Sequence, residues 1–213
     1  ATYPYGAGGP NAMFALITAN YMKRFGATRE DFGKIAVSQR HNAARNPNAL
    51  LKKPITLEDY LSARVISAPI HLLDCVMPCA GAEAFLVMRE EKARALGLDH
   101  VLMRGAIERH NAYTEDPVMV RGGWMMDQKD LYAQAGIQPQ DIDVLQTYDD
   151  YPVISMMQFE GLGFCEPGGG PEYVRANSFT FDGTMPHNTT GGQLSAGQPG
   201  AAGGFLGLTE TMR

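Results

Sequence analysis

Apolar positions in the first part of the chain repeat at the spacing of helices. In the segment 11–26, Phe14, Ile17 and Tyr21 fall on one face of a helix, and Gly26 follows where a C-cap is expected. This pattern predicts a half-buried helix that ends at the glycine.

Two further helices are marked by their first residues. Thr28 with Asp31, and Thr56 with Asp59, have the spacing of a capping box, in which the side chains of the first and fourth residues bond each other's backbone N–H groups. The first of these helices is expected to end near Pro47. Both segments therefore predict helices with defined starts.

The pattern changes in the middle of the chain. Ala84–Met88 is a continuous apolar run, which is typical of a strand buried on both faces. Further strands are predicted at 100–109 and 141–150, helices at 89–97, 129–136 and 151–163, and a loop with a short strand at 168–186. Strands alternating with helices predict an α/β fold with mostly parallel sheets, whose functional groups gather at the carboxyl ends of strands.

Composition and charge narrow the function classes. The chain has 213 residues, 45% hydrophobic and 19% charged, with a net charge of -5. No run of lysine or arginine offsets this acidity, so we expect no nucleic-acid surface. There is no apolar run of 18 residues and no signal peptide, so we expect a cytoplasmic protein without a membrane span.

The cysteines and the chain ends add two expectations. Cys75, Cys79 and Cys165 are an odd number without a second pair to complete a zinc site, and buried thiols in a reducing compartment are expected instead of a metal. The chain begins at Ala1 rather than Met and stops at Arg213 within a helical pattern. We therefore expect an internal portion of a longer protein.

Four candidate functional residues lie at the end of the strand predicted at 141–150. Tyr148, Asp149, Asp150 and Tyr151 are expected to form an acid/base or substrate-orienting cluster, because adjacent carboxylates raise each other's pKa and a phenol can exchange a proton. The alternative is that the two aspartates cap the helix that follows.

A glycine-rich loop, 187–204, is the second candidate. Glycines let backbone approach a ligand closely, but the same pattern also suits a tight loop packed against a helix. Gln198 is the polar side chain at its tip, and it cannot take up or release a proton near neutral pH. The residues predicted here to contact substrate are His187, Asn188, Gly191, Gly192 and Gly197.

Four segments, in this order, resemble the thiolase superfamily. "YMKRFGATREDFGKIAVSQRHNAARNPNALLKKPITLEDYLSARVISAPIHLLDC" is similar to the segment after the nucleophile in sterol-carrier-type thiolases, and "GAEAFLVMREEKARALG" to the strand and helix that join their two halves. "AGIQPQDIDVLQTYDDYPVISMMQFEGLGFCEPGGG" resembles the region of their "NEAF" or "HDCF" signature. "NTTGGQLSAGQPGAAGG" resembles "GGxxxxGHPxGxxG". The likeness spans nearly the whole chain.

The resemblance implies a layered fold of mixed, mostly parallel sheets covered by helices and incomplete at both ends. Residues 1–90 would be the end of the N-terminal thiolase half with its helical loop region, and 91–213 most of the C-terminal half. The nucleophilic cysteine of the family would lie upstream of this chain and the second catalytic cysteine downstream. None of the three cysteines present matches either position.

Two positions at which this sequence differs from the thiolase motifs suggest which reaction it catalyses. Tyr148 replaces the Asn of "NEAF" or the His of "HDCF", and Gln198 replaces the His of "GHP" that helps to activate the cysteine and stabilise the oxyanion. This combination resembles the thiolase-like aldolases of steroid side-chain degradation. It implies retro-aldol cleavage of a bulky, steroid-like β-hydroxyacyl-CoA, with Tyr148 as the base and Gln198 as a donor to the thioester carbonyl.

The same resemblance implies the partners and leaves two alternatives. Coenzyme A enters as part of the substrate, with Asp149 and Asp150 among the substrate-binding residues, and no cofactor is covalently bound. A homodimer and a small OB-fold and zinc-ribbon partner protein are expected. The alternatives are an acyltransferase whose cysteine lies outside this chain, and a non-catalytic lipid or acyl-CoA carrier.

Overall fold

The computed structural model describes residues 3–213, and most of their regular structure is helical. The α-helices are α1 (Pro10–Phe25), α2 (Arg29–Ala43), α3 (Leu57–Ser62), α4 (Glu90–Ala95), α5 (Trp124–Ala135), α6 (Pro152–Gly161), α7 (Gly170–Ala176), α8 (Gly192–Ser195) and α9 (Leu206–Met212). Short 3-10 turns are η1 (Tyr3–Tyr5), η2 (Leu72–Asp74), η3 (Pro139–Asp141) and η4 (Gly200–Phe205). No helix in this range is both long and apolar enough to cross a membrane.

The helix starts at Thr28 and Thr56 and the stop at Gly26 are confirmed, whereas α2 ends at Ala43, before the stop predicted near Pro47. Gly26 ends α1 with φ 69°, and its N–H donates to the carbonyl of Met22 at 2.9 Å. The backbone N–H of Thr28 donates to Asp31 Oδ2 at 2.8 Å at the start of α2. The equivalent capping bond opens α3. These local signals hold because caps satisfy backbone groups that the helix itself leaves unpaired.

The later helices are confirmed as well, with one addition. Helices α4, α5 and α6 form at the predicted places, and Pro152 occupies the first turn of α6. Residues 168–186 were expected to be a loop and a short strand, but Gly170–Ala176 form α7 and no strand follows. Pro171 in the first turn of α7 is a helix-start signal that the sequence prediction missed.

The predicted strands are not formed among residues 3–213. The sheet found there is a two-stranded antiparallel ribbon of β1 (Val65–Ser67) and β2 (Ile70–His71). The run Ala84–Met88, expected to be buried on both faces, is extended and solvent-exposed, with Leu86 82% and Val87 77% accessible. A strand is stabilised by a hydrogen-bonded neighbour, and within the described residues no neighbour pairs with this run. The layered sheet predicted from the sequence is therefore not seen.

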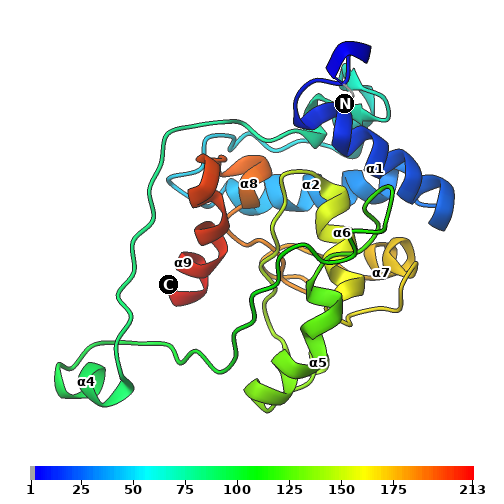
Figure 1. Ribbon diagram of the computed structural model, residues 1–213. Helices are drawn as coiled ribbons and strands as arrows, with labels where there is room; N and C mark the ends of the chain where they lie inside the picture. The colour runs from blue at the N-terminus through cyan, green and yellow to red at the C-terminus, as the bar shows by residue number, and fades with distance from the viewer. Residues whose placement is uncertain (1–2) are drawn as a thin grey trace.

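Helix α6 forms the centre of the core. All ten of its residues are buried, and it lies between α1, α2, α5 and α7 in Figure 1. The Phe159 ring stacks on Phe179 at a centroid distance of 5.2 Å, and the Tyr21 hydroxyl of α1 donates to the Glu160 carboxylate. This helix consequently fixes the position of the residues just before it, 145–150.

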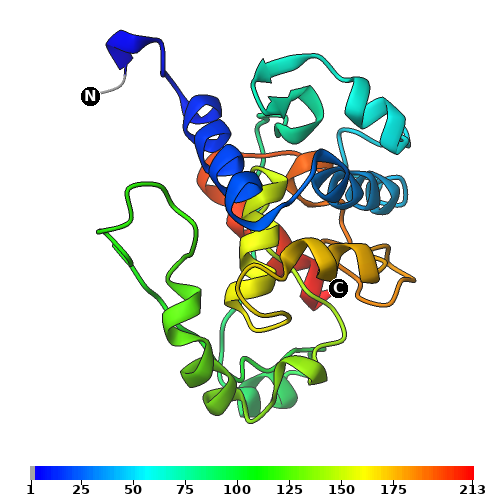
Figure 2. The same cartoon turned by 90° about the vertical axis from the view of Figure 1, so that its right-hand side faces the viewer.

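A long segment leaves the core between η2 and α5. Figures 1 and 2 show it extending to α4 and returning to α5 below the core. On its return, the Trp124 ring packs against Gly161, where an added Cβ would lie 2.2 Å from Trp124 Nε1. The absence of a side chain at Gly161 thus lets α5 dock on the end of α6.

We expect Phe159→Ala to lower the free energy of unfolding of this chain by about 3–5 kcal/mol, because it removes a fully buried ring and leaves a cavity. Leu86→Ala is the matched control, and it should change the free energy by less than about 0.5 kcal/mol because Leu86 is exposed. Denaturant unfolding of both variants measures the difference. Equal costs for the two substitutions would contradict this description of the core.

Candidate active site

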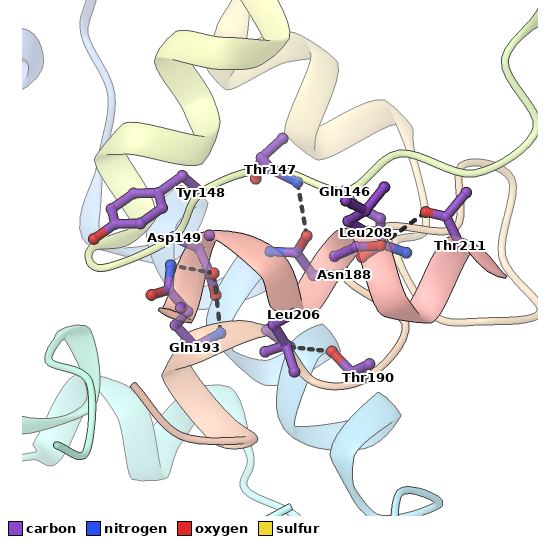
Figure 3. A pocket seen from close by; sticks show the side chains of 14 residues that line it. Gln146, Thr147, Tyr148, Asp149, Asn188, Thr190, Gln193, Leu206, Leu208 and Thr211 are labelled. Carbon is purple, nitrogen blue, oxygen red and sulfur yellow. Dashed lines mark hydrogen bonds between the residues drawn. The ribbon is translucent and has the colours of Figure 1, made fainter. Parts of the chain in front are cut away.

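The two candidate segments of the sequence lie side by side. The Leu145 N–H donates to the Pro186 carbonyl at 2.9 Å, and the Asn188 N–H donates to the Leu145 carbonyl at 3.0 Å. The Thr147 N–H donates to Asn188 Oδ1 at 2.8 Å, as Figure 3 shows. Residues 145–150 and the start of the glycine-rich loop therefore meet.

Asp149 joins these two segments through its side chain. Its Oδ1 accepts from the Gln193 N–H at 3.0 Å and its Oδ2 from the Leu194 N–H at 3.2 Å. The side chain is only 1% exposed, and burial raises the pKa of Asp149 to about 6 in spite of these bonds. The predicted capping of the following helix by Asp149 is therefore wrong, because the N–H groups that Asp149 binds belong to α8.

Tyr148 is accessible where Asp149 is not. It is 40% exposed, and its hydroxyl donates to Asp150 Oδ2 at 3.0 Å. Asp150 therefore does not cap α6, where Tyr151 is the N-cap residue and has no capping side-chain bond. The expected cluster of a phenol and a carboxylate is present.

Gln158 holds the backbone of Tyr148 in place. Its Nε2 donates to the Tyr148 carbonyl at 2.7 Å, and its Oε1 accepts from the Tyr148 N–H at 3.2 Å. The sequence analysis missed this residue. The glutamine in the mostly apolar helix "PVISMMQF" was the available signal, because a buried amide needs polar partners.

Gln198 lies next to the Tyr148 and Asp150 pair. Burial is the largest cause of a raised pKa for both Tyr148 and Asp150, and the nearby Gln198 amide offsets part of each rise. The Gln198 side chain hydrogen-bonds with the Gly200 backbone, with its Oε1 accepting from the Gly200 N–H at 3.0 Å. Three residues that the sequence singled out thus come together.

The loop around Gln198 is fixed by residues 77–79. The Gln198 N–H donates to the Met77 carbonyl at 2.9 Å, and its carbonyl accepts from the Cys79 N–H at 3.1 Å. Gly197 before it has φ 129°, and a Cβ there would lie 2.9 Å from Cys79 Sγ. Only glycine fits this conformation and this contact without strain.

The other predicted glycines also pack against protein. Gly192 has φ 60°, and a Cβ on it would lie 2.2 Å from Asp149 Oδ2. A Cβ on Gly191 would lie 2.4 Å from Ala43 Cβ on α2. These contacts favour the packing alternative for the two glycines, and substrate contact by them stays a prediction.

His187 and Asn188 have different surroundings. His187 is 0% exposed and packs edge-on against the rings of Phe159 and Phe179. Burial lowers its pKa to about 3, so the imidazole is neutral, and it hydrogen-bonds with Thr147 Oγ1 at 2.8 Å. This places His187 in the core, and substrate contact by it stays a prediction, whereas Asn188 lines a cavity.

A cavity of about 310 Å³ lies beside these segments (Figure 3). Its lining residues are Gln146, Thr147, Tyr148, Asp149, Asn188, Thr190, Gly192, Gln193, Gly203, Gly204, Leu206, Gly207, Leu208 and Thr211. Asp150 and Gln198 are not among them. Tyr148 therefore borders the cavity and also contacts the Asp150 carboxylate next to Gln198.

Cys75, Cys79 and Cys165 are free cysteines that form no disulfide. Burial raises the pKa of Cys75 to about 11 and that of Cys165 to about 12, so both are thiols rather than nucleophilic thiolates at neutral pH. Among residues 3–213, no group of three or more His, Cys, Asp or Glu side chains could hold a metal ion.

Comparison with known proteins identifies relatives of this chain. Residues 105–213 match the family described as thiolase C-terminal domain-like. The chain is 35% identical, over 99% of its length, to a steroid side-chain-cleaving aldolase of Thermomonospora curvata. It is 34% identical, over its full length, to the 17-hydroxy-3-oxo-4-pregnene-20-carboxyl-CoA lyase of Mycobacterium tuberculosis. It spans about half of these relatives, 55% and 56% of their lengths.

A solved structure agrees with the sequence matches. The chain superimposes on a chain of the Ltp2-ChsH2(DUF35) aldolase with a TM-score of 0.79 and 31% identity, covering 95% of this chain and 55% of that one. The thiolase-like fold is therefore confirmed for the chain, although the layered sheet is not formed among residues 3–213.

We expect the stability of the protein to depend on the proton of Asp149. Its pKa in the folded chain is raised from 3.8 to about 6, so the folded state binds this proton more tightly than the unfolded state. The resulting stabilisation is complete below the unfolded pKa and is lost as the pH rises through about 6. The loss is on the order of 3 kcal/mol.

Denaturant unfolding at a series of pH values measures this effect. Wild type should gain stability relative to Asp149→Asn as the pH falls from about 7 to about 5. Asp143→Asn is the control, because Asp143 is an exposed carboxylate on the same segment. A difference between wild type and Asp149→Asn that stays constant with pH would rule out the raised pKa.

Proposed function

This chain belongs to the thiolase family, and from that premise we propose that its protein cleaves a carbon–carbon bond of a β-hydroxyacyl-CoA by a retro-aldol reaction. The observation that carries the proposal is the meeting of Tyr148 and Gln198. The phenol of Tyr148 is accessible, and the Gln198 amide is close enough to change its pKa.

The residue types favour this reaction over thiolysis. Thiolysis needs a group that removes the proton of a cysteine thiol, and a glutamine amide cannot do so. A retro-aldol reaction needs a proton acceptor for the β-hydroxyl and hydrogen-bond donors for the thioester oxygen. Tyr148 can supply the first requirement and Gln198 the second.

The proposed reaction balances without a further reagent. The β-hydroxyl proton passes to the enzyme at Tyr148, and the β-carbon becomes a carbonyl as the Cα–Cβ bond breaks. The electron pair of that bond moves to the thioester enolate, whose oxygen accepts a hydrogen bond from Gln198 Nε2. The enolate then takes one proton at Cα, so the products are a ketone or aldehyde and a shortened acyl-CoA.

The proposal also covers the size of the acyl group and the partners with which the protein assembles. The names of the two relatives, a steroid side-chain-cleaving aldolase and a pregnene-carboxyl-CoA lyase, support a bulky steroid-like acyl group. We propose substrate contacts by Asn188, which lines the cavity, and by Asp150 beside Tyr148. A homodimer, a small OB-fold and zinc-ribbon partner, a cytoplasmic location and a completed layered sheet in the whole protein also stay proposals.

Acyl transfer is the competing function, because the family takes its name from thiolases. The decisive experiment incubates the full-length protein, together with its partner protein, with a steroid-side-chain β-hydroxyacyl-CoA. A parallel sample receives a β-ketoacyl-CoA with free CoA. Mass spectrometry of the products shows which substrate is consumed. Turnover of the ketoacyl substrate alone would reject the lyase, and turnover of neither would favour a carrier.

We expect Tyr148→Phe to lower kcat for cleavage by at least about 100-fold, because only the phenolic oxygen is removed. Binding of the CoA ester should change little, which calorimetry with a non-cleavable thioester analogue can check. Tyr132→Phe is the matched control, because the Tyr132 hydroxyl donates to the Leu162 carbonyl and is not part of the Tyr148, Asp150 and Gln198 cluster. Wild-type turnover by Tyr148→Phe would refute the assignment.

We expect Gln198→Ala to lower kcat by about 100- to 1,000-fold, as removal of one oxyanion donor does in other enzymes. Steady-state kinetics of cleavage measure the loss. Gln193→Ala provides a comparison within the same loop, since its amide is buried against Asp149. If Gln198→Ala changed only KM, the amide would bind substrate without stabilising the transition state.

A further inference from the structure

The state of Tyr148 sets a requirement on the proposed chemistry. Burial and the neighbouring Asp150 carboxylate raise its pKa above the ordinary value of 10. The phenol is therefore protonated near neutral pH. A protonated phenol can accept the β-hydroxyl proton only if it passes its own proton to another group.

Asp150 is positioned to receive that proton. The Tyr148 hydroxyl donates directly to Asp150 Oδ2 at 3.0 Å. The second oxygen, Asp150 Oδ1, is buried and has no hydrogen-bond partner among residues 3–213. An unsolvated carboxylate oxygen without donors makes the charged form less stable and the group a stronger base.

The charges around Asp150 do not oppose this role. The titratable groups that interact with it are Tyr148, Asp149 and Tyr151, and each is acidic. No salt bridge joins Asp150 to a cation within the described part of the chain. Burial accordingly raises the pKa of Asp150, and the hydrogen-bond donors Tyr148 and Gln198 offset only part of that rise.

We propose that Asp150 is the final acceptor of the proton in the retro-aldol reaction and that Tyr148 relays it, an inference that rests on the proposed function. The β-hydroxyl proton moves to Tyr148 Oη while the Tyr148 proton moves to Asp150 Oδ2. The Cα–Cβ electron pair becomes the enolate. Return of the proton along the same path to the enolate Cα restores both side chains, so no co-reactant is consumed.

The relay predicts that Tyr148 and Asp150 act as one unit. We expect Asp150→Asn to lower kcat for cleavage by about 100- to 10,000-fold, because the amide still accepts the Tyr148 hydrogen bond but takes no proton. The double variant Tyr148→Phe/Asp150→Asn should be no slower than the slower single variant. Asp150→Glu should recover part of the rate, and Asp143→Asn, which changes an exposed carboxylate on the same segment, should keep it.

The pH profile separates the relay from a structural role. In the wild type, kcat should rise with pH as Asp150 loses its proton, at a pH above the ordinary pKa of an aspartate. This rising limb should be absent in Asp150→Asn and present in Asp143→Asn. A limb that persists in Asp150→Asn belongs to Asp149, and it would overturn the relay, as would fully additive losses in the double variant.

A titration of Tyr148, which needs no substrate turnover, tests the relay separately from the proposed function. Nuclear magnetic resonance with ring-labelled tyrosine, assigned with Tyr148→Phe, follows the pKa of Tyr148. Asp150→Asn should lower that pKa, because a neighbouring negative charge is removed. An unchanged pKa, or wild-type kcat in Asp150→Asn while Tyr148→Phe is inactive, rejects the relay and leaves the lyase intact. Absence of cleavage by the wild type, with the pKa coupling present, rejects the lyase.

Discussion

The buried carboxylate of Asp149 is the contact on which the arrangement of the site depends. It binds two consecutive backbone N–H groups of α8, and thereby joins residues 145–150 to the loop that carries Gln198. Hydrogen bonds to charged groups in a low-dielectric interior are strong, and the cost of leaving such a group unpaired is high. The glycine at position 192 is required because a side chain would collide with this carboxylate.

Asp149 and Asp150 are adjacent in the sequence, but the first has a structural role and the second the proposed chemical role. Their side chains have different surroundings. Asp149 is enclosed by backbone donors, whereas Asp150 receives a phenol and retains an unsatisfied oxygen. Two carboxylates with different environments acquire different roles, which is how one local sequence can supply both a support and a proton acceptor.

The sequence predicted what depends on nearby residues. Helix starts at Thr28 and Thr56 and the stop at Gly26 were correct because capping involves neighbours within four residues. The strand at 84–88 was wrong because pairing depends on segments far away in the chain. The meeting of Tyr148 with Gln198 was anticipated, but the support by Gln158 and the burial of His187 were not, since both arise from the packing of α6.

The packing of α5 against α6 can be followed by tryptophan fluorescence. Trp124 is the sole tryptophan of the sequence, and its ring packs against Gly161 at the end of the central helix. Its indole N–H is buried without a hydrogen-bond partner in the described part of the chain. The fluorescence emission of this indole therefore reports whether α5 is packed against the end of α6. Tryptophan emission is distinct from that of the tyrosines of the site.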